Sequence, residues 1–157
     1  MSFTKYQSLG NRVVLVSGGA SGIGEAFVRA FADNGARVAF LDLQEEAGQV
    51  LAKSLAGSVR HAPLFLRCDV TRTDELIAAI AEARRKLRPA SALINNAAND
   101  QRQTFTDVTP EEFDRTIAVN FRHVYFASQA VVPQMVERGG DRSSTCRRSP
   151  GRSARPS

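Results

Sequence analysis

Four short apolar segments, separated by segments with helical spacing, constrain the fold of this chain more than any other feature. The apolar segments lie at 12–17, 36–43, 63–68 and 90–95, and the helical segments between them at 23–34, 45–56 and 74–87. Strands that alternate with helices are joined by right-handed crossovers, which give a parallel sheet with helices on both faces. The sequence therefore predicts an α/β fold with a doubly wound parallel sheet. Ligands of such sheets bind beyond the carboxyl ends of the strands.

A further helical region follows the fourth apolar segment. Thr109 is a typical capping residue, and Pro110 with two following Glu residues is typical of a first helical turn. We expect this helix to break or bend before Asn120 and a long helical stretch to continue to about Glu137. Since no fifth apolar strand follows, the sheet is predicted to be truncated after about four strands, in a partial domain spanning 1–138.

Residues 139–157 differ in composition from the rest of the chain. From position 141 onward there are five Arg and one Asp among Ser and Pro residues, with no periodicity. Such a segment cannot bury enough apolar surface to offset its ordering entropy, so we expect a disordered Arg/Ser-rich tail. This tail carries most of the net charge of +5 and leaves the first 140 residues near neutral. A nucleic-acid partner is therefore not expected.

The composition is that of a soluble protein. No apolar run approaches the ~20 residues of a membrane-spanning helix, and the first residues lack the pattern of a secretory signal. Cys68 and Cys146 are far apart, which fits a reducing compartment and not a zinc site. We expect a cytoplasmic protein with no membrane partner and no metal. His61 and His123 are single and unpartnered in the sequence, so we expect them at the surface or at the edge of the core.

A glycine-rich turn follows the first predicted strand, where Ser17–Gly24 reads Ser-Gly-Gly-Ala-Ser-Gly-Ile-Gly. Glycine lets the backbone turn sharply and approach a pyrophosphate, whose charge the next helix N-terminus can hold. The spacing is G-x-x-x-G-x-G, and such a turn alone can also be purely structural. Asp42, at the end of the second strand, strengthens the nucleotide hypothesis. Its carboxylate can accept both hydroxyls of an adenosine ribose and repel a 2′-phosphate, which favours NAD over NADP. A helix-capping Asp is the alternative.

Five motifs together resemble the short-chain dehydrogenase/reductase family, in that family's order and spacing over roughly residues 10–138. They are Gly18-x-x-x-Gly22-x-Gly24, Asp42, Cys68-Asp69-Val70, Asn95-Asn96-Ala97-Ala98 and Asn120. The resemblance implies a Rossmann-type fold, a nicotinamide cofactor, a small-molecule alcohol or carbonyl substrate and, for the intact form, a homo-oligomer. It also implies that Asp69 contacts the adenine amino group and that Asn120 supports a proton-relay water. The cofactor-binding residues predicted in this way are Ser17, Gly18, Ser21, Gly22, Ile23, Gly24, Asp42, Asp69, Val70, Asn95 and Ala97.

A narrower resemblance is to the NAD-dependent aldose (xylose-type) dehydrogenases of the same family. It rests on residues 99–102, Asn-Asp-Gln-Arg, and on residues 119–123, Val-Asn-Phe-Arg-His. The resemblance implies a sugar oxidised at its anomeric carbon to a lactone.

The family's hydride transfer needs a Tyr, a Lys four residues later and a Ser, because a phenol with a pKa of ~10 is a poor base without a nearby cation. The only tyrosines here are Tyr6 and Tyr125, Gln129 stands four residues after Tyr125, and no Lys follows Lys86. Tyr125 is therefore expected to pack on the core. Of the family's catalytic residues only Asn120 has a counterpart, and the chain as written is predicted to be inactive.

The sequence of the tail suggests why the family's other catalytic residues have no counterpart here. Read one base earlier, the codons of residues 140–150 permit an apolar strand that ends in a serine-bearing turn, so we expect the tail to derive from a frameshift. Two other hypotheses remain open. The chain could be a non-catalytic NAD-binding module with a basic interaction tail, or a truncation product without function. Salt-dependent nucleic-acid binding that disappears on deletion of 141–157 would favour the module.

Overall fold

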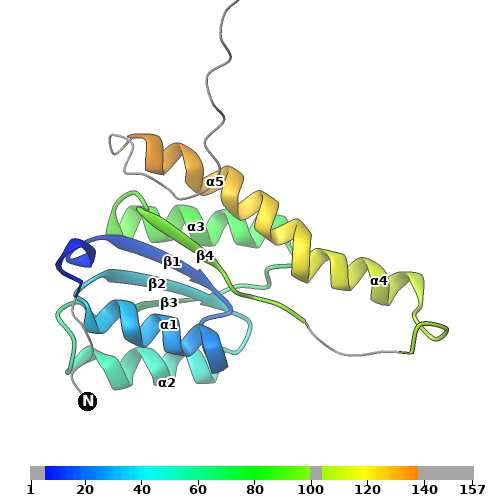
Figure 1. Ribbon diagram of the computed structural model, residues 1–157, viewed down its shortest axis with the longest axis horizontal. Helices are drawn as coiled ribbons and strands as arrows, with labels where there is room; N and C mark the ends of the chain where they lie inside the picture. Colours follow the sequence, from blue (N-terminus) through cyan, green and yellow to red (C-terminus); the bar gives the residue numbers. More distant parts are fainter. Residues whose placement is uncertain (1–5, 100–103, 138–157) are drawn as a thin grey trace, which may run out of the picture.

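A four-stranded parallel sheet forms the centre of the molecule (Figure 1). The computed structural model describes residues 6–99 and 104–137. The strands are β1 (Val13–Ser17), β2 (Arg37–Asp42), β3 (Leu64–Arg67) and β4 (Ala92–Asn95), in the order β3-β2-β1-β4. All three strand pairs are parallel. The strand order reverses between β1 and β4, so the topological switch point lies at the carboxyl ends of these two strands.

Helices cover both faces of the sheet. Figure 1 shows α1 (Gly22–Asp33) and α2 (Glu45–Ala56) on one side, and α3 (Thr73–Leu87) with α5 (His123–Glu137) on the other. The residues of β1 alternate accordingly, because successive side chains of a strand point to opposite faces. Val14 and Val16 pack with α1 and α2, whereas Val13 and Leu15 pack with α3 and α5. The predicted α/β fold is confirmed.

The last helical region is continuous, with an irregular turn around Asn120 where the sequence predicts a break or a bend. The helix α4 (Pro110–Ile117) continues through a π-helical segment, Ala118–Arg122, into α5. Thr109 and Glu112 form a reciprocal capping box at the start of α4, as the sequence pattern predicts. No residue of α4 is buried, and the helix extends past the end of the sheet (Figure 1).

The structure differs from two sequence-based expectations about which residues are buried. Tyr125 is expected to pack on the core, but 59% of its surface is exposed. In α1 the spacing of Ile23, Ala26, Phe27, Ala30 and Phe31 indicates a core-facing stripe, but the buried residues are Gly24, Val28 and Ala32. The helix has so many apolar residues that its periodicity fits two stripes, and Gly24 lies too close to the Gly18 carbonyl for any side chain there.

The predicted tail, 139–157, lies outside the described residues. Within the part of the chain that the structure describes, no helix is long and apolar enough to cross a membrane.

Candidate functional site

The glycine-rich turn connects β1 to α1 at the switch point. Gly18 and Gly22 have φ values of +65° and +56°, in the region that favours glycine. A Cβ on Gly22 would meet no atom within 4 Å, so the backbone is open there to an approaching group. Ser21 precedes α1 but makes no side-chain cap hydrogen bond, which leaves the first turn of the helix without a side-chain acceptor. This end of α1 therefore suits an anion.

Asp42 ends β2 beside this turn and is buried, with 8% of its surface exposed. Its Oδ2 accepts a hydrogen bond from the Ala20 amide at 2.9 Å, and its Oδ1 accepts one from the Gln44 amide at 3.0 Å. The carboxylate thus holds the glycine-rich turn and the backbone just before α2. It is not a helix cap, the alternative that the sequence left open, because the N-cap of α2 is Gln44 and the helix has no side-chain cap. Since an ionised carboxylate has about four acceptor sites, further hydrogen bonds to a ligand remain compatible with these two.

Asp69 and Val70 follow β3, at the same carboxyl end of the sheet as the glycine-rich turn and Asp42. The Asp69 carboxylate accepts hydrogen bonds from the Thr71 hydroxyl at 2.7 Å and the Thr71 amide at 2.9 Å. The bond from the Thr71 hydroxyl is the main cause that lowers the pKa of Asp69, with smaller contributions from Arg115 and Arg72, while partial burial opposes the shift. Asp69 is therefore ionised at neutral pH.

The segment after β4 approaches the glycine-rich turn from the other side of the switch point. The Asn96 side chain donates to the Gly18 carbonyl at 2.9 Å. A Cβ on Gly18 would come within 2.7 Å of the Ala97 Cα, so only glycine allows this close approach. Asn95, the last residue of β4, pairs in register with Ser17.

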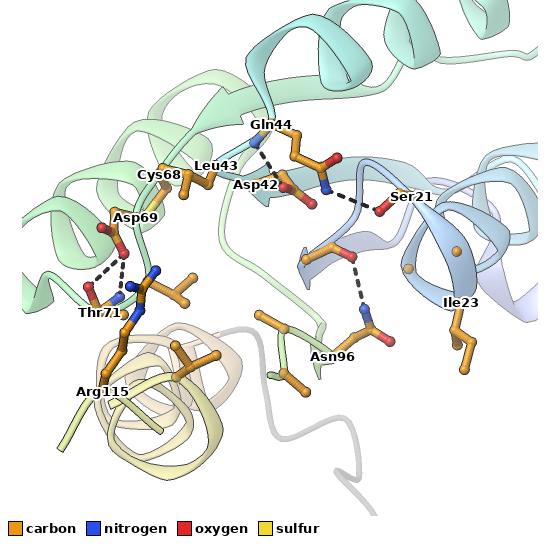
Figure 2. A pocket seen from close by; sticks show the side chains of 17 residues that line it. Ser21, Ile23, Asp42, Leu43, Gln44, Cys68, Asp69, Thr71, Asn96 and Arg115 are labelled. Atoms are coloured by element: carbon orange, nitrogen blue, oxygen red, sulfur yellow. Dashed lines mark hydrogen bonds between the residues drawn. The ribbon is translucent and has the colours of Figure 1, made fainter. Parts of the chain in front are cut away.

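A cavity of about 890 Å³ lies at the carboxyl ends of the strands (Figure 2). It collects nine of the eleven predicted cofactor-binding residues, and Ser17 and Asn95 are the two that do not line it. Its full lining is Gly18, Ser21, Gly22, Ile23, Gly24, Asp42, Leu43, Gln44, Cys68, Asp69, Val70, Thr71, Asn96, Ala97, Ala98, Arg115 and Val119. Gly19 and Ala20, inside the turn, are buried beneath it.

Arg115 and Val119 are lining residues that sequence reasoning did not identify. They come from α4 and from the π-helical segment, and Figure 2 shows Arg115 beside Asp69 and Thr71. A charged residue on an exposed helix is usually only solvated, and no local pattern in the sequence indicates that α4 reaches the cavity. The only available signal was the expected helix break before Asn120.

Asn120 lies in the π-helical segment and its side chain is exposed. Its amide group makes a reciprocal pair with the Asn99 backbone: Oδ1 accepts from the Asn99 N–H at 2.7 Å, and Nδ2 donates to the Asn99 carbonyl at 2.8 Å. Asn120 does not line the cavity, but it joins the helical region to the segment that follows β4. Isolated π turns are frequent at functional sites.

Both histidines have hydrogen-bond partners in the structure, and the burial of His123 corrects the expectation that it lies at the surface or at the edge of the core. His61 is hydrogen-bonded to the Asn11 side chain at 2.8 Å. His123 is buried, with 1% of its surface exposed, and contacts Ser17 and Val119. The two rings lie in different parts of the fold. Among the described residues, no group of three or more His, Cys, Asp and Glu side chains could hold a metal ion.

Comparisons with known proteins identify the same kind of fold. The family model described as short chain dehydrogenase matches residues 12–142. The chain is 44% identical over 137 residues to a probable galactose dehydrogenase of Rhizobium meliloti, and the match covers 87% of this chain and 54% of the relative. It is 41% identical over 140 residues to the D-xylose 1-dehydrogenase of Caulobacter vibrioides, covering 89% and 54%.

A solved structure is similar as well. The crystal structure of L-sorbose reductase from Gluconobacter frateurii, complexed with NADPH and L-sorbose, matches with a TM-score of 0.79 and 25% identity. The match covers 83% of this chain and 49% of that one. The chain therefore spans about half the length of the relatives it matches.

Proposed function

The chain belongs to the short-chain dehydrogenase family, and from this premise we propose that it is the cofactor-binding half of an NAD-dependent oxidoreductase. The whole enzyme would transfer a hydride between NAD and a hydroxyl or carbonyl group of a small molecule. The observation that carries the proposal is the convergence of the glycine-rich turn, Asp42, Asp69 and Ala97 on one cavity at the switch point.

The described residues fit a dinucleotide. The cavity is large enough for one, since ligand pockets typically measure ~300–1,000 Å³. The open backbone at Gly22 and the first turn of α1 suit a pyrophosphate, because amides there point toward an anion and the helix dipole favours negative charge. Asp42 would accept hydrogen bonds from ribose hydroxyls, and its negative charge would repel a 2′-phosphate. This repulsion is our reason for proposing NAD instead of NADP.

The other residues would orient the bound molecule. Asp69 is ionised and would accept a hydrogen bond from the adenine amino group, while Val70 offers an apolar contact next to it. When bound, the nicotinamide supplies the hydride acceptor. Asn95 ends β4 and Ala97 follows it at the switch point, so Ala97 would lie along the cofactor with Asn95 next to it in the chain. Asn120 would support a proton-relay water next to the reacting groups.

For the whole enzyme we propose an aldose as substrate, oxidised at its anomeric carbon to a lactone. The names of the two curated relatives, galactose dehydrogenase and D-xylose 1-dehydrogenase, support a sugar substrate. Residues 99–102 and 119–123, which resemble the aldose branch, give additional support. A full-length version that ignored aldoses but reduced ketones or acyl-carrier substrates would contradict this proposal.

We expect no hydride transfer by these 157 residues alone, because they contain no Tyr-x-x-x-Lys pair. Tyr125 has 59% of its surface exposed, lies edge-on to Phe126 and has Gln129 four residues later. We propose that the tail derives from a frameshift. Sequencing the DNA from the Asn120 codon onward tests this, since the frame shifted by one base should continue and encode Tyr-x-x-x-Lys. Early closure of that frame would mean that the tail is genuine.

Nucleotide titration of the full chain tests the proposed function. A ligand that binds the folded state stabilises it by about 2.7 kcal/mol at a hundred times its dissociation constant, so NAD should raise the melting temperature more than NADP does. The decisive variant is Ile23→Asp, at an exposed position in the first turn of α1 that lines the cavity. An acid there should weaken NAD binding by about tenfold or more through repulsion of the pyrophosphate, although acids in the first turn stabilise a helix.

The matched control is Val50→Asp, at an exposed position on α2 that does not line the cavity. It should leave the dissociation constant for NAD unchanged. If no nicotinamide nucleotide stabilises the chain, the binding proposal fails and the hypothesis of a truncation product without function is favoured.

A further inference from the structure

His123 is a buried titratable side chain behind the cofactor cavity, and the roles proposed so far do not use it. It is the first residue of α5, and its ring lies beneath the carboxyl end of β1. Nε2 lies 3.3 Å from the Ser17 hydroxyl oxygen, and Nδ1 contacts the Val119 carbonyl. Both ring nitrogens therefore have partners inside the protein.

The π-helical segment makes the contact with Val119 possible. The His123 backbone N–H donates to the Ala118 carbonyl, five residues earlier, and not to Val119, four residues earlier. The Val119 carbonyl is thus available to the ring. In the same segment the exposed Asn120 side chain bonds to the Asn99 backbone. The irregular turn therefore leaves Asn120 exposed and His123 buried.

The partners of the ring determine where its proton lies. A carbonyl oxygen can only accept, so Nδ1 carries the hydrogen and donates to Val119. Burial lowers the pKa of His123, and the bond to Val119 only partly opposes this shift, so the ring is neutral at pH 7. In the neutral ring Nε2 is an acceptor, and the Ser17 hydroxyl must therefore donate its proton to Nε2.

The orientation of the Ser17 hydroxyl then follows. With its proton directed to His123, its oxygen is free to accept from the Asn96 amide at 3.1 Å and from the Ala97 amide at 3.2 Å. These three bonds use the one donor and the two lone pairs of a hydroxyl. Ser17 is buried, with 1% of its surface exposed, so water does not compete for these bonds.

We propose that His123 is a positioning residue for the nucleotide site, acting through Ser17 on the segment that follows β4. By fixing the Ser17 hydroxyl, the ring holds the Asn96 and Ala97 amides against the end of β1. This sets the close approach of Ala97 to Gly18, and Ala97 and Gly18 both line the cavity. The inference rests on the proposed function, because the expected effect of holding these two amides in place is tighter nucleotide binding.

Three substitutions separate this role from a general contribution to stability. His123→Leu removes the acceptor, and Ser17→Ala removes the hydroxyl that links the ring to Asn96 and Ala97. His123→Gln is the conservative variant, because its side-chain oxygen reaches about as far as Nε2 and still accepts from Ser17. We expect His123→Leu and Ser17→Ala each to weaken NAD binding by about tenfold, and His123→Gln to stay within about threefold of the native chain.

Gln134→Leu is the matched control. Gln134 is another buried polar residue of α5, and it accepts from the Ala90 amide at 3.1 Å, away from the cavity. The Gln134→Leu substitution should lower the urea midpoint as His123→Leu does, yet leave the NAD dissociation constant unchanged. The proposal would be overturned if His123→Leu bound NAD as tightly as the native chain does. It would also be overturned if His123→Leu and Gln134→Leu lost NAD affinity to the same extent.

A second readout does not depend on nucleotide binding. In nitrogen-15 spectra of the full chain, the His123 ring should be the neutral form protonated at Nδ1. The amide signals of Asn96 and Ala97 should shift in His123→Leu and Ser17→Ala but not in Gln134→Leu. A native chain that binds no NAD but shows these signals refutes the proposed function while supporting the arrangement. A ring protonated at Nε2 refutes the arrangement itself.

Discussion

The Asp42 side chain both holds two backbone segments together and lines the cavity. Its two oxygens accept the Ala20 and Gln44 amides, and the same residue lines the cavity. In Asp42→Asn one oxygen becomes an NH₂ group that faces an N–H. We therefore expect a loss of about 1–3 kcal/mol in the free energy of unfolding, measured by urea denaturation at pH 7.

The same variant should also bind NAD and NADP with similar affinity, since the charge that repels a 2′-phosphate is gone. Asp33→Asn, at an exposed position at the end of α1, is the control and should change neither quantity. An unchanged ratio of NAD to NADP affinity in Asp42→Asn would mean that Asp42 serves only to hold the two turns.

Cys68 lies at the end of β3, and burial raises the pKa of its thiol to about 12, with Glu75 and Asp69 adding to the shift. The unfolded thiol has a pKa of about 8.5, so the unfolded state loses its proton first as the pH rises. The stabilising contribution of this group is full below about pH 8.5 and is lost progressively toward pH 12. Between pH 9 and 11 the free energy of unfolding should fall by up to about 1.4 kcal/mol per pH unit.

This prediction is measured in a Cys146→Ser background, in which Cys68 is the only thiol of the sequence. Urea midpoints from pH 7 to 11 give the slope, and Cys68→Ala in the same background removes this group's contribution. Thiol reagents at pH 8 should label the native chain only after urea is added. Rapid labelling without urea would show that the thiol is accessible and that its pKa is not raised by burial.

The capping box of α4 is a feature of a single element, and its removal should act locally. The Thr109 side chain accepts from the Glu112 amide at 3.3 Å, and the Glu112 carboxylate accepts from the Thr109 amide at 3.0 Å. Loss of an N-cap costs about 0.5–2 kcal/mol of helix stability. Because no residue of α4 is buried, Thr109→Ala should speed amide hydrogen exchange in α4 without moving the urea midpoint.

Thr104→Ala, an exposed threonine before the same helix, should leave both unchanged. A lowered urea midpoint in Thr109→Ala would mean that α4 is coupled to the core more strongly than its exposure indicates.

The elements themselves could be predicted from the sequence wherever a local pattern determined them. The expected helix at 45–56 matches α2, because acidic residues begin it and a glycine follows it. The contact of Arg115 with the cavity and the hydrogen bond between His123 and Ser17 could not be predicted. Both join residues that are distant in the chain, and no local sequence pattern determines such contacts.

At the scale of the whole molecule, the open side of the sheet is the main liability of the described chain. All four residues of β4 are only half-buried, and β4 is an edge strand whose unpaired backbone groups can pair with another chain. Close to it, the outer face of the π-helical segment and α5 exposes apolar side chains, including Phe121 at 67%, Tyr125 at 59% and Val132 at 53%. Val131 of the same helix faces the other way and is fully buried against α3 and the sheet.

We therefore expect the chain to associate as its concentration rises, and to unfold in urea with a slope below the ~1–3 kcal/mol per molar typical of small proteins. Light scattering across a concentration series measures the association, and Val132→Lys should reduce it because it places a charge on the exposed face of α5. Val50→Lys makes the same change at an exposed valine on α2 and should have no effect, since α2 covers the opposite face of the sheet. A monodisperse chain with a sharp, size-appropriate transition would contradict this account, because it would require β4 and the face of α5 to be stable in water without a cover.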